Sequence, residues 1–264
     1  MKIRKIKLII LFVFIITAAG CFRNPEAVND GYLFNVQGCR IYGSFIPPPN
    51  VLLCKTIHGG LPPQEGKGKD CFILLHGLGS NHYEWQKLCD ALTTRGYGYL
   101  AYDVRGHGKS IEDKDGNPVN YKYFTNDWQK MTGDLGRGVK FLKSRGIREK
   151  NIIIIGASLG ANIALNYYVA HPGISLPVLL SPGMEYARIE IGRAIENYGY
   201  KALIVMASPG DTYAWNSSVS IVHSVHGAVF ISGEGALHGA NMLTDEKIKS
   251  LIDNIEAIKT RRGA

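Results

Sequence analysis

The chain has 264 residues, of which 45% are hydrophobic and 20% are charged. This composition excludes a disordered or acidic solvating chain. The length suits one or two domains, and α/β folds often exceed about 200 residues as a single unit. The formal net charge of +8 would suit a nucleic-acid partner if the basic residues lie on the folded domain.

The first twenty residues have the pattern of an export signal. Four basic residues within positions 1–7 precede an apolar run from Leu8 to Ile16, and small residues follow up to Gly20. A basic region, a short apolar region and small residues in this order are typical of a secretory signal peptide. The segment 8–20 is too short for a membrane-spanning helix, which needs roughly 18 residues.

The signal ends in Ala18-Ala19-Gly20-Cys21, which resembles the lipobox of bacterial lipoproteins. That motif usually has Leu three residues before the cysteine, where this chain has Ala18. The resemblance implies removal of positions 1–20 and lipidation of Cys21, with palmitate as a typical acyl group. The protein would then be exported and anchored to a membrane of the bacterial cell envelope. Ordinary cleaved secretion, giving a secreted or periplasmic soluble protein, and an uncleaved anchor remain alternatives.

Half of the net positive charge lies in this signal. It holds four of the 30 basic residues and none of the 22 acidic ones, so the remaining chain carries a net charge of +4. The basic residues within 140–150 lie on or beside a predicted helix among apolar positions, which is typical of a solvated face. We therefore expect no nucleic-acid partner.

After a polar tether at 22–31, the segment 32–57 predicts an antiparallel opening of a sheet, and 59–70 predicts a surface loop. Strands and helices then alternate, which predicts one α/β domain over 32–264 with a mostly parallel sheet covered on both faces. The expected strands are 71–75, 98–102, 151–155, 177–180, 202–206 and 228–231. The expected helices are 82–95, 128–144, 159–170, 189–198, 217–223 and 245–259.

Four cysteines remain besides the predicted lipidation site, too few for a disulfide scaffold. Cys71 opens an apolar strand and Cys89 lies in an amphipathic helix, so we expect both to be buried. Cys39 and Cys54 flank a Pro-rich bend, and an exported protein permits disulfides, so whether these two pair stays open.

Gly156-Ala157-Ser158-Leu159-Gly160 is a G-x-S-x-G pattern between a predicted strand and a predicted helix. In this context the tight turn presents the serine at the N-terminus of the helix, where backbone N–H groups face a developing anion. Ser158 is therefore the predicted nucleophile. The bare pattern is common by chance, and the strand–turn–helix context is what makes it specific.

A serine hydroxyl needs a base that is oriented by an acid. Asp211 lies on a loop after the strand 202–206, and His238 lies on a loop after the strand 228–231. Both follow the carboxyl ends of their strands, where such sheets bind ligands. Each alone would be read as a turn or surface residue, but together, and after Ser158 in the chain, they predict the acid and the base.

The tetrahedral intermediate of such a reaction needs two backbone N–H donors. Leu159 N–H, directly after the serine, is one candidate. Leu78 N–H, in the loop after the strand 71–75, is the other, and His76 in the same loop is expected to brace the loop.

The combination of His76-Gly77, 103–110, 156–160, Asp211 and His238 resembles the α/β-hydrolase fold, over about residues 32–260. The resemblance implies a Ser158–His238–Asp211 triad with an oxyanion hole formed by Leu78 and Leu159. It also implies that the stretch 103–110 is structural. The combination is far more specific than any one of its motifs.

Two other motifs do not meet their requirements. Gly108-Lys109-Ser110 resembles the end of a P-loop, but the glycine required five positions before Gly108 is Asp103. Gly233 and Gly235 follow a strand, but the third glycine of a dinucleotide fingerprint would fall at His238. We expect no cofactor and no metal site.

The segment 180–202 leaves no room for a large cap over the site. Tyr121, Tyr123 and Phe124 could form a substrate pocket or seat their loop, and Tyr213 could line the site or anchor the acid loop. The sequence therefore predicts a serine esterase that acts on a small-molecule carboxylic ester or thioester. A small peptidase or amidase and a non-catalytic binding protein remain alternatives, and the oligomeric state stays open.

Overall fold

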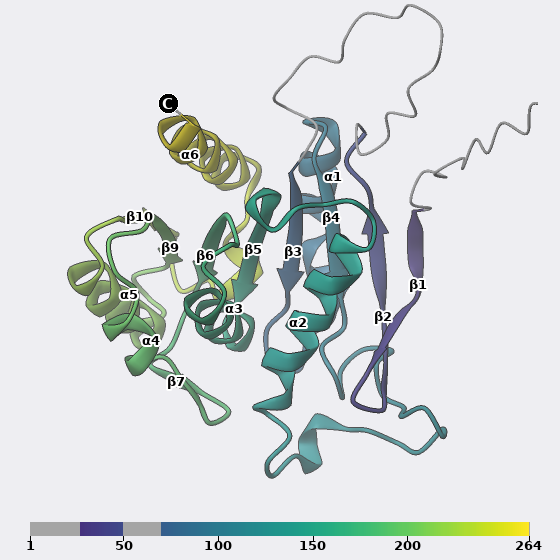
Figure 1. Ribbon diagram of the computed structural model, residues 1–264. Coiled ribbons are helices and arrows are strands. Elements are labelled where there is room, and N and C mark those ends of the chain that lie inside the picture. The colour runs from purple at the N-terminus through teal and green to yellow at the C-terminus, as the bar shows by residue number, and fades with distance from the viewer. Residues whose placement is uncertain (1–26, 50–69, 264) are drawn as a thin grey trace, which may run out of the picture.

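A computed structural model describes residues 27–49 and 70–263 (Figure 1). The strands are β1 (Val28–Val36), β2 (Cys39–Ile46), β3 (Cys71–Leu75), β4 (Gly98–Tyr102), β5 (Ile152–Ala157), β6 (Leu176–Leu180), β7 (Glu185–Tyr186), β8 (Ile189–Glu190), β9 (Leu203–Ala207) and β10 (Ala228–Ser232). The helices are α1 (Gln86–Thr94), α2 (Lys130–Lys143), α3 (Leu159–Ala170), α4 (Gly192–Glu196), α5 (Thr212–Ser224) and α6 (Asp245–Gly263). Short 3-10 turns are η1 (His82–Trp85), η2 (Tyr121–Tyr123), η3 (Glu149–Asn151) and η4 (Gly239–Met242).

Eight strands form one sheet in the order β1-β2-β4-β3-β5-β6-β9-β10. In this sheet, strands β4, β3, β5, β6, β9 and β10 run parallel to one another, and β1 and β2 add an antiparallel edge. The expected mostly parallel sheet is confirmed. Because β4 and β5 lie on opposite sides of β3, the chain changes direction there, and the carboxyl ends of β3 and β5 border the crevice where such sheets bind ligands.

Helices cover both faces of this sheet (Figure 1). One face packs against α2, α3, α4 and α5 through side chains such as Ile73 and Ile154. The other face packs against α1 and α6 through side chains such as Leu74 and Ile155. The central strands are therefore buried on both faces, which explains their unbroken apolar sequence.

Two predicted boundaries were wrong. β1 begins at Val28, so the last residues of the expected tether 22–31 belong to the sheet. The expected helix 189–198 is shortened to α4, because Ile189 and Glu190 pair with the two residues of β7 instead. Asn162 and Asn166 of α3 donate side-chain hydrogen bonds to the carbonyl oxygens of these two residues and hold them in the hairpin.

The remaining predicted elements are present, with ends that differ by a few residues, most at the start of α5. Cys71 and Cys89 are buried as expected, and Cys39 is buried too. The predicted signal at 1–20, Cys54 and most of the predicted loop 59–70 lie outside the described residues. Within the described residues, no helix is both long enough and apolar enough to cross a membrane.

One buried ion pair ties the loop after β4 to α2. The side chains of Arg105 and Asp134 are 4% and 0% exposed. Arg105 Nε donates to Asp134 Oδ2 at 2.6 Å, and a second guanidinium N–H donates to the other carboxylate oxygen. Both charges depend on this pairing, because an unpaired charge is very unfavourable away from water.

We expect Asp134→Ala to lower the free energy of unfolding by about 3–5 kcal/mol, because the guanidinium would stay buried without its partner. The double variant Arg105→Met/Asp134→Leu removes both charges and should recover most of that loss. Urea unfolding followed by circular dichroism measures both. If Asp134→Ala were as stable as the wild type, the Arg105–Asp134 pair would not contribute to the free energy of unfolding as predicted.

Candidate active site

Ser158 lies at the sharp turn between β5 and α3. Its backbone has φ 54° and ψ −118°, a left-handed conformation that non-glycine residues seldom adopt. A Cβ atom at Gly156 would lie 2.1 Å from the Gly160 carbonyl oxygen, and one at Gly160 would lie 2.2 Å from the Leu75 carbonyl oxygen. Both glycines are therefore required by close backbone contacts, as the G-x-S-x-G pattern predicts.

Asp211 and His238 are brought together from two neighbouring strands. Asp211 follows β9, His238 follows β10, and His238 Nδ1 lies 2.6 Å from Asp211 Oδ2. Gly210 N–H donates to the Gly235 carbonyl oxygen at 2.8 Å, so the two loops are also joined through their backbones. The carboxylate is 16% exposed and the imidazole 43% exposed, which leaves the free side of the ring open to a reactant.

Ser158 and His238 line the same hollow, with a volume of about 250 Å³. Ser158 is 7% exposed and lies in the turn between β5 and α3. The other residues that line this hollow are Gly77, Leu78, Ser80, Glu84, Ala157, Gly239, Ala240 and Asn241. The structure thus places Ser158, Asp211 and His238 at one edge of the sheet, although 80 residues of sequence separate the first from the last.

The loop after β3 forms the opposite wall of this hollow. Gly77 lies so close that a Cβ atom there would be 3.4 Å from the Ser158 Cβ. Leu78 is 50% exposed and lines the hollow. Leu159 is the first residue of α3, where backbone N–H groups have no partner within the helix. Both predicted oxyanion donors therefore flank the nucleophile candidate.

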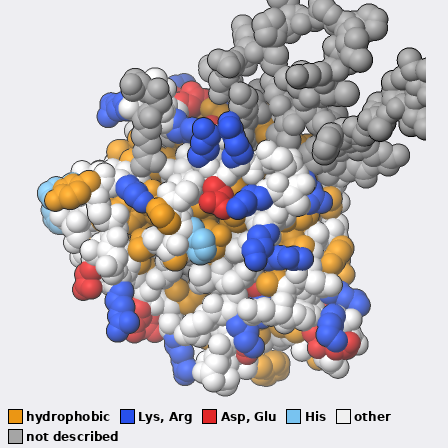
Figure 2. Space-filling model, viewed as in Figure 1, with side chains coloured by type: hydrophobic (Ala, Val, Ile, Leu, Met, Phe, Trp, Pro, Cys, Tyr) orange, Lys and Arg blue, Asp and Glu red, His pale blue; other side chains and the backbone are white. Residues whose placement is uncertain are grey.

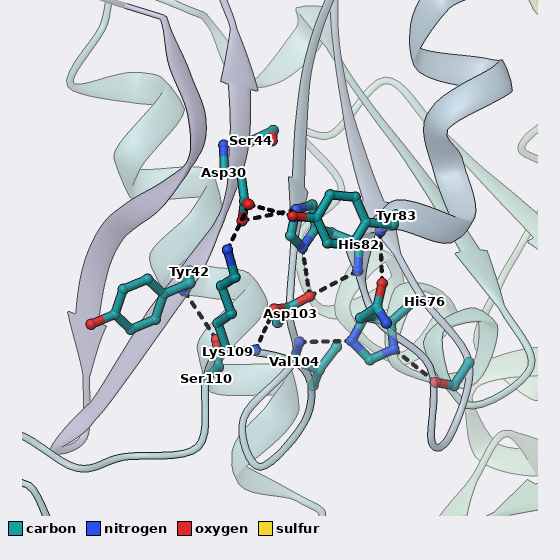
Figure 3. Close-up of polar contacts among 12 residues, drawn as sticks. Asp30, Tyr42, Ser44, His76, His82, Tyr83, Asp103, Val104, Lys109 and Ser110 are labelled. Atoms are coloured by element: carbon teal, nitrogen blue, oxygen red, sulfur yellow. Dashed lines mark hydrogen bonds and ion pairs between the residues drawn. The ribbon is translucent and has the colours of Figure 1, made fainter.

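His76 braces this loop rather than facing Ser158. Its Nε2 accepts a hydrogen bond from Val104 N–H at 2.9 Å, and its Nδ1 lies 2.7 Å from the Gly77 carbonyl oxygen (Figure 3). The neutral tautomer with hydrogen on Nδ1 satisfies both contacts. Burial, with a smaller effect of nearby His107, lowers the pKa of His76 to about 4, so the ring stays neutral at physiological pH.

A buried carboxylate joins the loop after β3 to the loop after β4. Asp103 accepts hydrogen bonds from His82 N–H, at 2.8 Å, and from Lys109 N–H, at 2.7 Å, while His82 Nδ1 lies 2.7 Å away (Figure 3). Burial raises the pKa of Asp103, but these hydrogen bonds outweigh burial, and the resulting pKa is below its usual value. Asp103 holds two loops together, which agrees with a structural role for the stretch 103–110.

Tyr186, on β7, is a site residue that the sequence did not identify. Its ring stands edge-on to the His238 ring, with centroids 6.2 Å apart. Burial and the nearby Asp211 carboxylate raise the pKa of Tyr186 to about 12, so its hydroxyl stays protonated at physiological pH.

Glu84 and Ser181 are two further site residues that the sequence did not identify. Glu84 lines the hollow and accepts a hydrogen bond from Gly77 N–H at 3.2 Å. Burial raises the pKa of the Glu84 carboxyl, although hydrogen bonds from Ser80 and Gly77 oppose this. The buried Ser181 hydroxyl accepts a hydrogen bond from Gly239 N–H at 2.9 Å and so fixes the residue next to His238. None of these contacts has a local sequence signal.

The four aromatic residues predicted to bind substrate lie outside the hollow beside Ser158. Tyr121 stacks on His107 with centroids 4.1 Å apart, and Phe124 packs edge-on against Trp128. Tyr123 is 83% exposed. The Tyr213 hydroxyl bonds to the backbone of Glu185, so its visible role is to anchor the β7–β8 hairpin.

The sequence matches a known hydrolase family over more than half of its length. The family described as serine aminopeptidase S33 matches residues 66–207. This range includes the loop after β3 and the turn that holds Ser158, and it ends shortly before Asp211.

Two curated relatives match shorter regions. The AB hydrolase superfamily protein YisY of Bacillus subtilis (strain 168) is 30% identical over 108 residues, which are 41% of this chain and 35% of that protein. Epoxide hydrolase B of Mycobacterium tuberculosis is 27% identical over 152 residues, which are 55% of this chain and 35% of that protein. The chain thus matches about a third of the length of each relative.

Solved structures resemble the whole described domain. A carboxylesterase structure from the thaumarchaeon Nitrososphaera gargenis superposes with a TM-score of 0.66 at 13% identity, covering 87% of this chain and 99% of that one. A structural similarity at 13% sequence identity is evidence for the fold alone. Together with the strand order, it confirms the expected α/β-hydrolase fold.

Ser181→Ala should lower the free energy of unfolding by about 1–3 kcal/mol, because the buried Gly239 N–H loses its acceptor. The matched control is Ser232→Ala, at an exposed position where the hydroxyl bonds only to the adjacent Gly233 carbonyl oxygen, and its effect should stay within about 0.5 kcal/mol. Urea unfolding of both variants gives the comparison. Equal losses in the two would contradict the anchoring role of Ser181.

Proposed function

The chain belongs to the serine aminopeptidase S33 family of hydrolases, and we propose that it cleaves carboxylic esters or thioesters through an acyl-enzyme. The observation that carries this proposal is the Asp211–His238 pair, 2.6 Å apart, in a site where His238 and Ser158 line one hollow. A serine at a left-handed strand-to-helix turn, beside an imidazole oriented by a carboxylate, is the arrangement that activates a hydroxyl for attack on a carbonyl carbon.

In the proposed reaction, His238 takes the proton of the Ser158 hydroxyl through Nε2 as the oxygen attacks the carbonyl carbon. Asp211 accepts the Nδ1–H of the same ring, which keeps Nε2 unprotonated beforehand and stabilises the imidazolium afterwards. The backbone N–H groups of Leu78 and Leu159 would stabilise the negative oxygen that forms. His238 then returns the proton to the leaving alcohol or thiol.

Hydrolysis of the acyl-enzyme repeats these steps with water. His238 is 43% exposed, so water can reach its free nitrogen after the leaving group departs. His238 takes a proton from this water, the hydroxide attacks the acyl carbon, and the proton passes to Ser158 as the acid is released.

The size of the hollow favours small acyl groups. Its volume of about 250 Å³ lies just below the range of roughly 300–1,000 Å³ that is common for sites of drug-sized ligands. Between β6 and β9 the chain forms only the β7–β8 hairpin and α4, so the far end of the substrate can extend into solvent. The family match supports a second candidate, cleavage of an amide in a small peptide.

We expect a fluorophosphonate probe to label the wild-type protein and to leave Ser158→Ala unlabelled, because the probe reacts only with an activated serine. Hydrolysis of short-chain esters should fall at least about 1,000-fold in Ser158→Ala and in Asp211→Asn, the latter because the imidazole takes the wrong tautomer. Gel fluorescence and initial rates measure these effects.

The matched control is Ser80→Ala, which removes another hydroxyl from the same hollow and should leave labelling intact. A panel of esters, thioesters and aminoacyl amides then separates the two candidate activities. Unlabelled wild-type protein, or equal labelling of Ser158→Ala, would overturn the serine-hydrolase proposal and leave the non-catalytic alternative.

We also propose that the chain is exported and anchored to a membrane through lipid on Cys21, on the strength of the signal pattern and the Ala-Ala-Gly-Cys ending. Mass spectrometry of the protein from a bacterial host should find an N-terminal peptide that begins at a lipidated Cys21. Cys21→Ser should stay unmodified, whereas Cys89→Ser, at a buried cysteine, should be lipidated like the wild type. An intact Met1 or an unmodified Cys21 in the wild type would refute this.

A further inference from the structure

We propose that the outer side of α2 and the segment that follows it form a docking surface for a bilayer of anionic phospholipid. This surface, called the basic face below, consists of Arg137, Lys140, Lys143, Arg145, Arg148 and Lys150. The proposal goes beyond the hydrolytic activity, since none of these residues lines the hollow at Ser158.

The basic face carries the excess charge of the folded chain. Positions 137–150 hold six basic residues and one acidic residue, Glu149. Residues 21–264 have a net charge of +4, so that segment alone exceeds the total and the rest of that chain has a net charge of −1. A neutral domain with one strongly basic face has a preferred orientation at a negatively charged surface.

Most of these basic side chains are exposed to solvent and have no acidic partner among the described residues. Five of the six side chains are exposed, while Arg145 is half-buried with its guanidinium 3.4 Å above the Phe141 ring. Lys143 pairs with Glu149. The other four exposed side chains have no ion pair with an acidic side chain within residues 27–49 and 70–263. They are Arg137, Lys140, Arg148 and Lys150. Figure 2, in which the side with α2 faces the viewer, shows several blue side chains across the middle of this surface.

The basic face is hollowed, and apolar side chains lie among its cations. Two neighbouring hollows, of about 500 and 440 Å³, share Arg137 and Lys140 in their walls. Apolar and aromatic residues contribute to the lining, with Val36, Val139 and Tyr167 in the first and Tyr32, Phe34 and Phe141 in the second. Polar residues, among them Gln37, Glu149 and Asn35, also line these hollows. Cations beside apolar and aromatic side chains match the phosphate group and the upper acyl chain of a phospholipid.

The proposed anchor would hold this face at the membrane. The second hollow is lined by residues of β1, and β1 starts only seven residues after Cys21. Even a fully extended tether of this length reaches no more than about 24 Å. Each basic residue near an anionic surface strengthens attachment about fivefold, so four unpaired cations add substantially to a single lipid anchor.

This orientation leaves the candidate active site accessible. α2 begins on the side where the carboxyl ends of the strands lie and runs toward the opposite end of the sheet (Figure 1). The basic face is therefore on the flank of the domain, and the hollow at Ser158 opens at one end. We favour a bilayer over nucleic acid because the export signal directs the domain away from nucleic acid and toward a membrane.

The test is lysine footprinting of the full-length protein on vesicles of phosphatidylcholine with or without phosphatidylglycerol. A membrane-impermeant acetylating reagent should modify Lys140, Lys143 and Lys150 severalfold more slowly when phosphatidylglycerol is present. Lys87 and Lys249, on the helices that cover the other face of the sheet, should react equally in both. They are matched controls, because Lys249 is paired with Asp253 much as Lys143 is with Glu149, while Lys87 is exposed. High salt should abolish the protection.

Charge-reversal variants test whether the lysines of the basic face cause the protection. Lys140→Glu/Lys143→Glu should remove the protection of Lys150, and Lys87→Glu/Lys249→Glu should retain it. Both should hydrolyse a soluble ester at the wild-type rate, which verifies that they fold. Equal acetylation of the basic face on both kinds of vesicle would overturn the proposal. Protection by an added oligonucleotide, with none by phosphatidylglycerol, would assign the face to nucleic acid instead.

The test is independent of the two earlier proposals. Loss of the serine activity changes probe labelling and leaves the footprint unchanged. Binding to pure phosphatidylcholine vesicles reports on the anchor alone, whereas the difference between the two vesicle compositions reports on the basic face.

Discussion

The candidate site depends on how closely the start of α3 lies against the end of β3. A Cβ atom at Gly160 would come within 2.2 Å of the Leu75 carbonyl oxygen, so only glycine permits this approach. The contact places the loop after β3, which holds the candidate donor Leu78, beside Ser158 and the start of α3. The loops after β9 and β10 then need only to reach Ser158, because parallel strands end at the same edge of a sheet.

Much of this architecture could be predicted because its signals are local. β3, β4 and α3 have the ends that the sequence predicts, since unbroken apolar runs and the glycines beside them mark those ends. The G-x-S-x-G pattern encodes a turn whose steric requirement lies within five residues. Asp211 and His238 could be found because each lies in the loop after a predicted strand, and strand order then determines that they meet.

The rest depends on contacts between distant segments. Ser181 and Tyr186 owe their places to Gly239 and to the hairpin that α3 holds against the site, and nothing near them in sequence indicates this. The stretch 189–198 has apolar spacing that suits a helix, yet side chains of α3 capture its first two carbonyl oxygens. For the same reason, the sequence left open whether the aromatic residues at 121–124 form a substrate pocket or seat their loop, since spacing alone does not reveal which cavity a ring faces.

The antiparallel edge of the sheet is joined to the loop that borders Ser158. Asp30, on β1, bonds to the Tyr83 hydroxyl and to Lys109 Nζ, while Asp103 binds His82 and the Lys109 backbone (Figure 3). This chain of contacts sets a limit for truncated soluble forms of the protein. A form that starts beyond Asp30 would lose the partner of two side chains next to the loop after β3. Recombinant versions intended for crystallisation or enzymology should therefore retain the whole of β1, even where the signal and tether are removed.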